Sequence, residues 1–118
     1  MRYKIRYSPL AQNDLDTVWD EVWLASKSYD TADTYITEFT GKIAEKKRFP
    51  KSGIPLYYRG LFTGFYSVNF KKYKAFYRIR ENYIEVARVI LARRDFMKVL
   101  FGDNMDENDE YENLKSNL

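Results

Sequence analysis

The run YKAFYRIR, residues 73–80, carries three cationic side chains that could bind an anion. It alternates in the way that an extended strand with two different faces does. One face would carry Lys74, Phe76, Arg78 and Arg80, and the other Tyr73, Ala75, Tyr77 and Ile79. Ammonium and guanidinium groups bind phosphate, and an aromatic ring can stack on a base. The pattern therefore predicts a strand with a cationic face that could bind nucleic acid.

Two adjacent arginines, Arg93 and Arg94, follow the next apolar run and precede Asp95. Two interpretations are open. In a structural one, Asp95 caps a helical turn that ends at Phe101, and one arginine pairs with its carboxylate. In a functional one, Arg94 lies beside the cationic face and clamps a phosphate, because a guanidinium can donate two parallel hydrogen bonds. Both hold if the two arginines point in opposite directions.

Side chains suited to proton transfer are scarce. The chain has no histidine and no cysteine, which removes the side chain that titrates nearest neutral pH and excludes thiol catalysis and disulfides. Glu85 is the one carboxylate that we expect on the sheet, and such a residue more often pairs with a cross-strand lysine or arginine. No zinc, P-loop or dinucleotide-binding pattern is present, so we expect no metal and no cofactor.

The apolar periodicity predicts the elements that would position these side chains. Residues 2–7 alternate as a half-buried strand, and Ser8-Pro9 starts an amphipathic helix that runs to about residue 25 or 26. A second helix, capped by Asp30 or Thr31, extends toward Pro50. Residues 51–64 contain three glycines and a proline and are typical of a loop. Strands are expected over residues 65–70, 73–80 and 83–91.

These elements predict an α+β fold of order β-α-α-β-β-β, in which a helical hairpin packs on one face of a four-stranded, mainly antiparallel sheet. The opposite face would be open. The cations expected to converge on it are Arg2, Lys4, Arg6, Lys74, Arg78, Arg80 and Arg88, with Arg93 and Arg94 at its exit and Phe76 and Tyr66 or Tyr83 among them. The alternative is a solvated outer face, since an uncovered sheet needs polar residues and lysine discourages edge pairing.

Length and charge favour one domain and a tail. The 118 residues suffice for one core, and the 45% hydrophobic content excludes a disordered chain. Residues 103–118 hold six carboxylates and one lysine, a net charge of −5, whereas residues 1–102 are at +8. We expect a domain over residues 1–102 and a flexible acidic tail that could screen the cationic face. Without a signal peptide or membrane-spanning run, the protein is expected to be cytoplasmic.

Three segments resemble the RelE/ParE superfamily of toxins from bacterial type II toxin–antitoxin modules: YSPLAQNDLDTVWDEVW, FYSVNFKKYKAFYRI and ARVILARRDFMKVL. Residues 73–79 are similar to the family's YRVFYRI strand. Arg93-Arg94-Asp95 and the apolar turn behind it are similar to the family's GRRD signature. The resemblance covers about Met1 to Gly102, and it implies a toxin neutralised by a small antitoxin that lies across the helical hairpin and the basic edge of the sheet.

The resemblance also bears on activity. RelE-like members cleave messenger RNA at the ribosome. Of their catalytic positions, Arg94 matches the C-terminal arginine, but Lys74 stands in place of the central-strand arginine and the C-terminal tyrosine falls near Leu100. Ser67 and Asn69 replace two lysines. The chain is more similar to the ParE branch, whose members inhibit DNA gyrase. The residues that would contact the target are Arg93, Arg94, Lys74, Arg78, Arg80 and Phe76.

Two alternatives stay open. One is a metal-independent endoribonuclease acting on messenger RNA, in which Lys74, Arg78 and Arg94 stabilise the phosphate while Tyr73 or Glu85 moves protons. The other is an inactive member of the family that retains only antitoxin or DNA binding.

Overall fold

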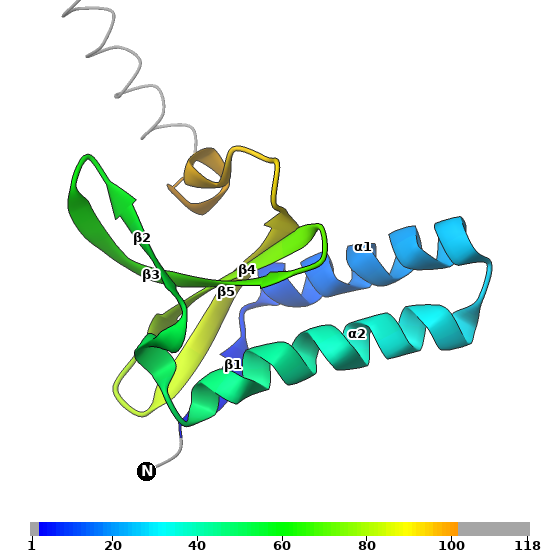
Figure 1. The fold of residues 1–118 in the computed structure, drawn as a ribbon, viewed down its shortest axis with the longest axis horizontal. Coiled ribbons are helices and arrows are strands. Elements are labelled where there is room, and N and C mark those ends of the chain that lie inside the picture. The colour runs from blue at the N-terminus through cyan, green and yellow to red at the C-terminus, as the bar shows by residue number, and fades with distance from the viewer. Residues whose placement is uncertain (1–2, 102–118) are drawn as a thin grey trace, which may run out of the picture.

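The computed structural model describes residues 3–101, in which two helices cover one face of a five-stranded sheet (Figure 1). The elements are β1 (Lys4–Tyr7), α1 (Pro9–Ser26), α2 (Tyr29–Ala44), β2 (Ile54–Tyr58), β3 (Leu61–Phe70), β4 (Tyr73–Ile79) and β5 (Tyr83–Leu91). The sheet order is β1-β5-β4-β3-β2, with β1 parallel to β5 and the other pairs antiparallel. The predicted α+β fold, a helical hairpin on a mainly antiparallel sheet, is confirmed.

The sheet has one strand more than the four predicted, because residues 51–64 are not a loop throughout. Residues Ile54–Tyr58 form the edge strand β2 and pair with the start of β3. Arg59 and Gly60 join the two strands, and both have positive φ, 53° and 79°. Two such residues make the turn that best matches the twist of a hairpin. Pro55 is tolerated because β2 lies at the edge of the sheet.

Side-chain caps begin both helices. The Ser8 hydroxyl accepts a hydrogen bond from the backbone N–H of Ala11 at 3.0 Å, as predicted for α1. The cap of α2 is Ser28, whose hydroxyl accepts from the N–H of Thr31 at 3.1 Å, so the prediction of Asp30 or Thr31 is wrong by two or three residues. None of the helices between residues 3 and 101 has the length and apolarity to cross a membrane.

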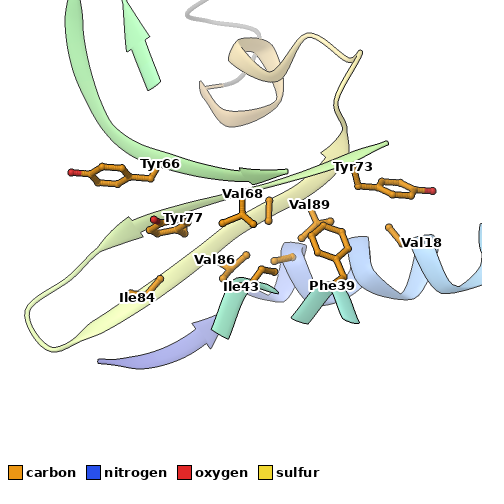
Figure 2. Close-up of a cluster of buried hydrophobic side chains, with 12 residues drawn as sticks. Val18, Phe39, Ile43, Tyr66, Val68, Tyr73, Tyr77, Ile84, Val86 and Val89 are labelled. Atoms are coloured by element: carbon orange, nitrogen blue, oxygen red, sulfur yellow. The ribbon is translucent and has the colours of Figure 1, made fainter. Parts of the chain in front are cut away.

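The main core lies between the helices and the sheet (Figure 2). At one end of this core, the buried Tyr77 hydroxyl donates to the Pro50 carbonyl at 2.6 Å and accepts from the Gly53 N–H at 3.1 Å. Gly53 is required there because a β-carbon would overlap that hydroxyl. The largest fully buried side chains of this core are Phe39 and Ile43 of α2 and Tyr77, Ile84 and Val86 of the sheet, and α1 contributes the buried Val18.

A second apolar cluster lies on the other side of the sheet. Residues 96–101 form a helical turn, and the Asp95 carboxylate caps it by accepting from the Lys98 N–H at 3.2 Å, as predicted. The turn lies on the side of the sheet away from α1 and α2 (Figure 1). It covers Phe65, Phe76 and Ile90 with Phe96, Val99, Leu100 and Phe101. The expectation of a wholly open face is therefore wrong, because the chain itself covers part of it.

Candidate target-binding face

The side of the sheet opposite α1 and α2, here called the outer face, carries the predicted cationic row of β4. Tyr73, Ala75 and Tyr77 belong to the helix-side core, whereas Phe76 belongs to the outer cluster. The alternation predicted for residues 73–79 is thus confirmed. In the register, Arg78 lies opposite Glu85 of β5 and Phe65 of β3, and Arg6 of β1 lies on the other side of Glu85.

Glu85 is held between two of the predicted cations. Its Oε1 accepts from Nε of Arg78 at 2.6 Å and lies 3.5 Å from Nη2 of Arg80. The hydrogen bond from Arg78 is the main reason why the pKa of Glu85 is lowered below its usual value. Glu85 is therefore an ionised partner of the arginines, with a pKa moved away from the range that suits a general base at neutral pH.

Phe76 lies on the outer face beside Lys74, as expected, but it is buried and not exposed. The Phe76 ring is 1% exposed, because Phe96 of the C-terminal turn packs on it with ring centroids 5.3 Å apart. Stacking of a base on Phe76 is excluded while residues 96–101 occupy this position. The Nζ of Lys74 lies 5.5 Å from the centroid of Phe96, and Arg78 lies 5.3 Å from that of Phe65. The cations of the outer face therefore lie over rings of the second cluster.

Tyr73 lies on the helix side of the sheet, away from Lys74 and Arg78. Its hydroxyl donates to the Glu21 carboxylate of α1. Burial first, and then this bond and the nearby negative charge, raise the pKa of Tyr73 well above the usual value for tyrosine. Such a hydroxyl keeps its proton at neutral pH. The structure thus places Tyr73 on the other side of the sheet from Lys74 and Arg78, in a hollow that it shares with Arg94.

Arg93 and Arg94 lie in the turn after β5, near α1. Arg93 borders a hollow of about 710 Å³ together with Leu24 and Ala25 of α1. Arg94 borders two smaller hollows, one of about 190 Å³ with Glu21 and Tyr73 and one of about 340 Å³ shared with Arg88, Asp95, Lys98 and Val99. The residues predicted to contact the target therefore lie in two places. Most lie on the outer face, whereas Arg93 and Arg94 lie at the edge of the sheet beside α1, here called the α1 edge.

Two further cations of the expected surface are already engaged. Arg88 binds the Asp14 carboxylate of α1 through Nε at 2.8 Å and Nη2 at 3.0 Å, so it is neutralised at the edge of β5. Arg6 lies on the ring of Tyr83, with its guanidinium carbon 4.4 Å from the centroid. Arg2 lies outside the described residues. Lys4 is exposed on β1.

Between residues 3 and 101 no cluster of three carboxylate, histidine or cysteine side chains could hold a metal ion. The hollow beside Arg93 could not be predicted from the sequence, because its apolar lining comes from two separate segments, Leu24 and Ala25 on one side and Leu91 and Ala92 on the other. Leu24 and Leu91 are adjacent only in the tertiary structure. The nearest signal in the sequence is the apolar residue Leu24 close to the predicted end of an amphipathic helix.

Comparisons with known proteins agree with this architecture. Residues 5–96 match the family model described as the ParE toxin of the type II toxin-antitoxin system, parDE. No curated protein sequence matches the chain. A chromosomal ParDE system from Pseudomonas aeruginosa superposes with a TM-score of 0.63 at 13% identity, covering 76% of this chain and 96% of that one.

Two other solved structures share the fold. The RelBE2 toxin–antitoxin complex from Mycobacterium tuberculosis has a TM-score of 0.52 at 22% identity and covers 77% of this chain and 99% of that one. A YoeB/ParE toxin from Agrobacterium tumefaciens has a TM-score of 0.52 at 17% identity, covering 75% and 96%. At these identities the similarity shows the fold, while the family model spans most of the domain. The chain belongs to the ParE toxin family of type II toxin–antitoxin systems.

Proposed function

We propose that this toxin arrests growth by binding DNA gyrase, the target associated with the ParE branch, and that it does not cleave RNA itself. The observation that supports this most directly is the state of the two candidate proton carriers. Glu85 is ionised between Arg78 and Arg80, and Tyr73 is bonded to Glu21 on the opposite side of the sheet. A ribonuclease would need a proton carrier beside one phosphate held by Lys74, Arg78 and Arg94 together, whereas Glu85 meets only Arg78 of these cations and Tyr73 only Arg94.

The cations retain a role in this proposal as a recognition surface. Lys74, Arg78 and Arg80 on the outer face and Arg94 at the α1 edge would contact carboxylates or phosphates of the target. Charge of this kind speeds encounter and fixes orientation more than it adds affinity. The double substitution of Lys74 and Arg94 by alanine should relieve growth arrest in cells, with the far-UV circular dichroism spectrum and melting temperature of the purified protein unchanged.

The experiment that tests the choice of target uses the purified toxin in two assays. Gyrase supercoiling of relaxed plasmid should be inhibited, and a messenger RNA on programmed ribosomes should stay intact. Cleavage of the message with unaffected supercoiling would replace this proposal by the endoribonuclease. A toxin that is well folded but inactive in both assays would identify it as an inactive family member.

The hollow beside Arg93 supports a specific contact with the antitoxin. Its lining combines the apolar residues Leu24, Ala25, Leu91 and Ala92 with the charged residues Glu21, Lys72 and Arg93. An amphipathic helix binds such a groove by inserting a few apolar anchors, while acidic residues beside the anchors would face the two cations. We place the helix of the cognate antitoxin there, between α1 and the exit of β5.

A further inference from the structure

The described part of the chain ends on the outer face, next to the β2–β3 hairpin. Phe101 packs on Phe65 of β3, with ring centroids 5.7 Å apart in an edge-to-face arrangement. Both the hairpin and residues 96–101 lie on the side of the sheet away from the helices (Figure 1). The residues that follow Phe101 therefore start beside the hairpin.

The apolar surface of this face continues beyond Phe101 but is uncovered among the described residues. Ile54 is 52% exposed and Leu61 74% exposed. Ile54 pairs with Ser67, which pairs with Phe76, so the three share the outer face. Leu61 pairs with Tyr58, and its neighbour Phe62 contacts Tyr66 of the helix-side core, which places Leu61 on the outer side by alternation.

The outer face also has an excess of positive charge. Arg78 and Arg80 share the single carboxylate of Glu85, and Lys74 lies over Phe96, with no carboxylate among the described residues within ion-pair distance of it. Each of these cations keeps part of its side chain in solvent. A ligand that suits this surface would combine apolar side chains with several carboxylates.

The sequence after Gly102 has this composition. The segment of residues 103–118 contains six carboxylates and one lysine. Its apolar residues are Met105, Tyr111, Leu114 and Leu118. Sixteen residues can span up to about 50 Å when extended, far more than the roughly 17 Å of a five-residue strand such as β2. The segment is long enough to cover the hairpin, and its covalent attachment at Phe101 gives an effective concentration of the order of millimolar.

We propose that residues 103–118 dock within the same chain on the outer face of the β2–β3 hairpin. The apolar side chains of the segment cover Ile54 and Leu61, and its carboxylates face Lys74, Arg78 and Arg80. The segment thereby occupies the cationic surface as a weak, displaceable ligand. Because the contact is partly electrostatic between exposed groups, salt weakens it.

The absence of cysteine allows a direct test with the full-length protein. A nitroxide spin label on Leu114→Cys should broaden the amide signals of Ile54 and Leu61 in a ¹⁵N-labelled sample, and raising the salt concentration from 50 mM to 500 mM should reverse part of the broadening. The matched control places the label on Thr37→Cys, which is exposed on α2 on the other side of the sheet. Broadening limited to residues adjacent to Phe101 would overturn the proposal.

Two further samples distinguish this occupant from others. The first sample mixes chains that carry the nitroxide but no ¹⁵N with chains that carry ¹⁵N but no nitroxide. The signals of Ile54 and Leu61 should stay sharp in this mixture. Broadening would identify a second copy as the occupant and overturn the proposal. Replacing the six acidic residues of the segment by Asn or Gln should abolish the broadening within one chain, and persistence at full strength would contradict the role of charge. None of these measurements involves gyrase or the antitoxin, so they stand apart from the proposed function.

Discussion

The carboxylate of Asp14 joins α1 to β5 by accepting two hydrogen bonds from Arg88, at 2.8 and 3.0 Å, and one from the backbone N–H of Val89, at 2.8 Å. Asp14 lies beside a part of β5 that has no neighbouring strand. Strand β1 ends at Tyr7, so β5 has no strand partner on that side beyond Val86. Ser8 donates to the Ala87 carbonyl at 2.8 Å, and Asp14 satisfies the next donor along. Two side chains thus continue the ladder where the strand stops.

Removal of this carboxylate should destabilise the fold. Asp14→Ala leaves the mostly buried guanidinium of Arg88 without its partner and the Val89 N–H unsatisfied, which we expect to cost about 2–3 kcal/mol of unfolding free energy. Urea denaturation measures it. The matched control is Asp16→Ala on the exposed side of the same helix, which should stay within about 0.5 kcal/mol of the wild type. Equal losses in the two variants would contradict the bridging role of Asp14.

The Tyr77 hydroxyl should contribute to stability by connecting β4 to the segment before β2. Tyr77→Phe removes the donor to Pro50 and the acceptor for Gly53 in a fully buried site, at a cost of about 1–3 kcal/mol. Tyr66→Phe is the control. The Tyr66 ring stacks on that of Tyr77, with ring centroids 5.6 Å apart, but the Tyr66 hydroxyl makes no hydrogen bond with another described residue. Thermal denaturation should show the larger loss for Tyr77→Phe.

Stability should fall in alkaline solution. Burial raises the pKa of both Tyr7 and Tyr77 to about 12, from 10 in the unfolded chain. Between these values the unfolded chain loses protons that the folded chain keeps, so the free energy of unfolding decreases as the pH rises from 10 to 12. Below pH 10 neither residue makes stability depend on pH. Denaturation at a series of pH values should give a shallower decline for Tyr7→Phe, and an unchanged slope would contradict the raised pKa.

Glu85→Gln distinguishes the two activities. If the toxin binds its target through cations, this substitution frees Arg78 and Arg80 and growth arrest is kept or strengthened. If Glu85 moves a proton in RNA cleavage, activity falls by a factor of about 10² or more. The fold should tolerate the change, with a loss below about 1 kcal/mol, because both arginines are more than a third exposed. Dilution plating after induction measures arrest, with Glu81→Gln in the adjacent turn as control.

The apolar hollow next to Arg93 predicts which surface leucine matters for neutralisation. Leu10 and Leu24 are both on α1 and both 57% exposed, but only Leu24 lines the hollow. We expect Leu24→Gln to weaken antitoxin binding at least tenfold, about 1.4 kcal/mol, with growth arrest unchanged. Leu10→Gln should bind the antitoxin like the wild type. Isothermal titration calorimetry would compare them, and equal affinities would place the antitoxin elsewhere.

Much of the fold could be predicted from the sequence because the signals are local. Alternation over residues 73–79 predicted which side chains of β4 face the helices, and the Ser8-Pro9 pair predicted the start of α1. Strand β2 was missed because Pro55 and the glycines around it are typical of loops, whereas its pairing with β3 is not visible in any short window. The cap of α2 was missed because Ser28, Asp30 and Thr31 all have side chains that can cap a helix.

The sequence by itself determined the cationic composition of β4, the lack of histidine and cysteine, and the acidic charge of residues 103–118. Only the tertiary structure decided how those charges are used. It pairs Glu85 with two arginines, neutralises Arg88 with Asp14 from a helix 74 residues earlier, and covers Phe76 with Phe96. The physical reason is that such pairs form between groups far apart in the chain, so their partners depend on how the sheet and helices pack.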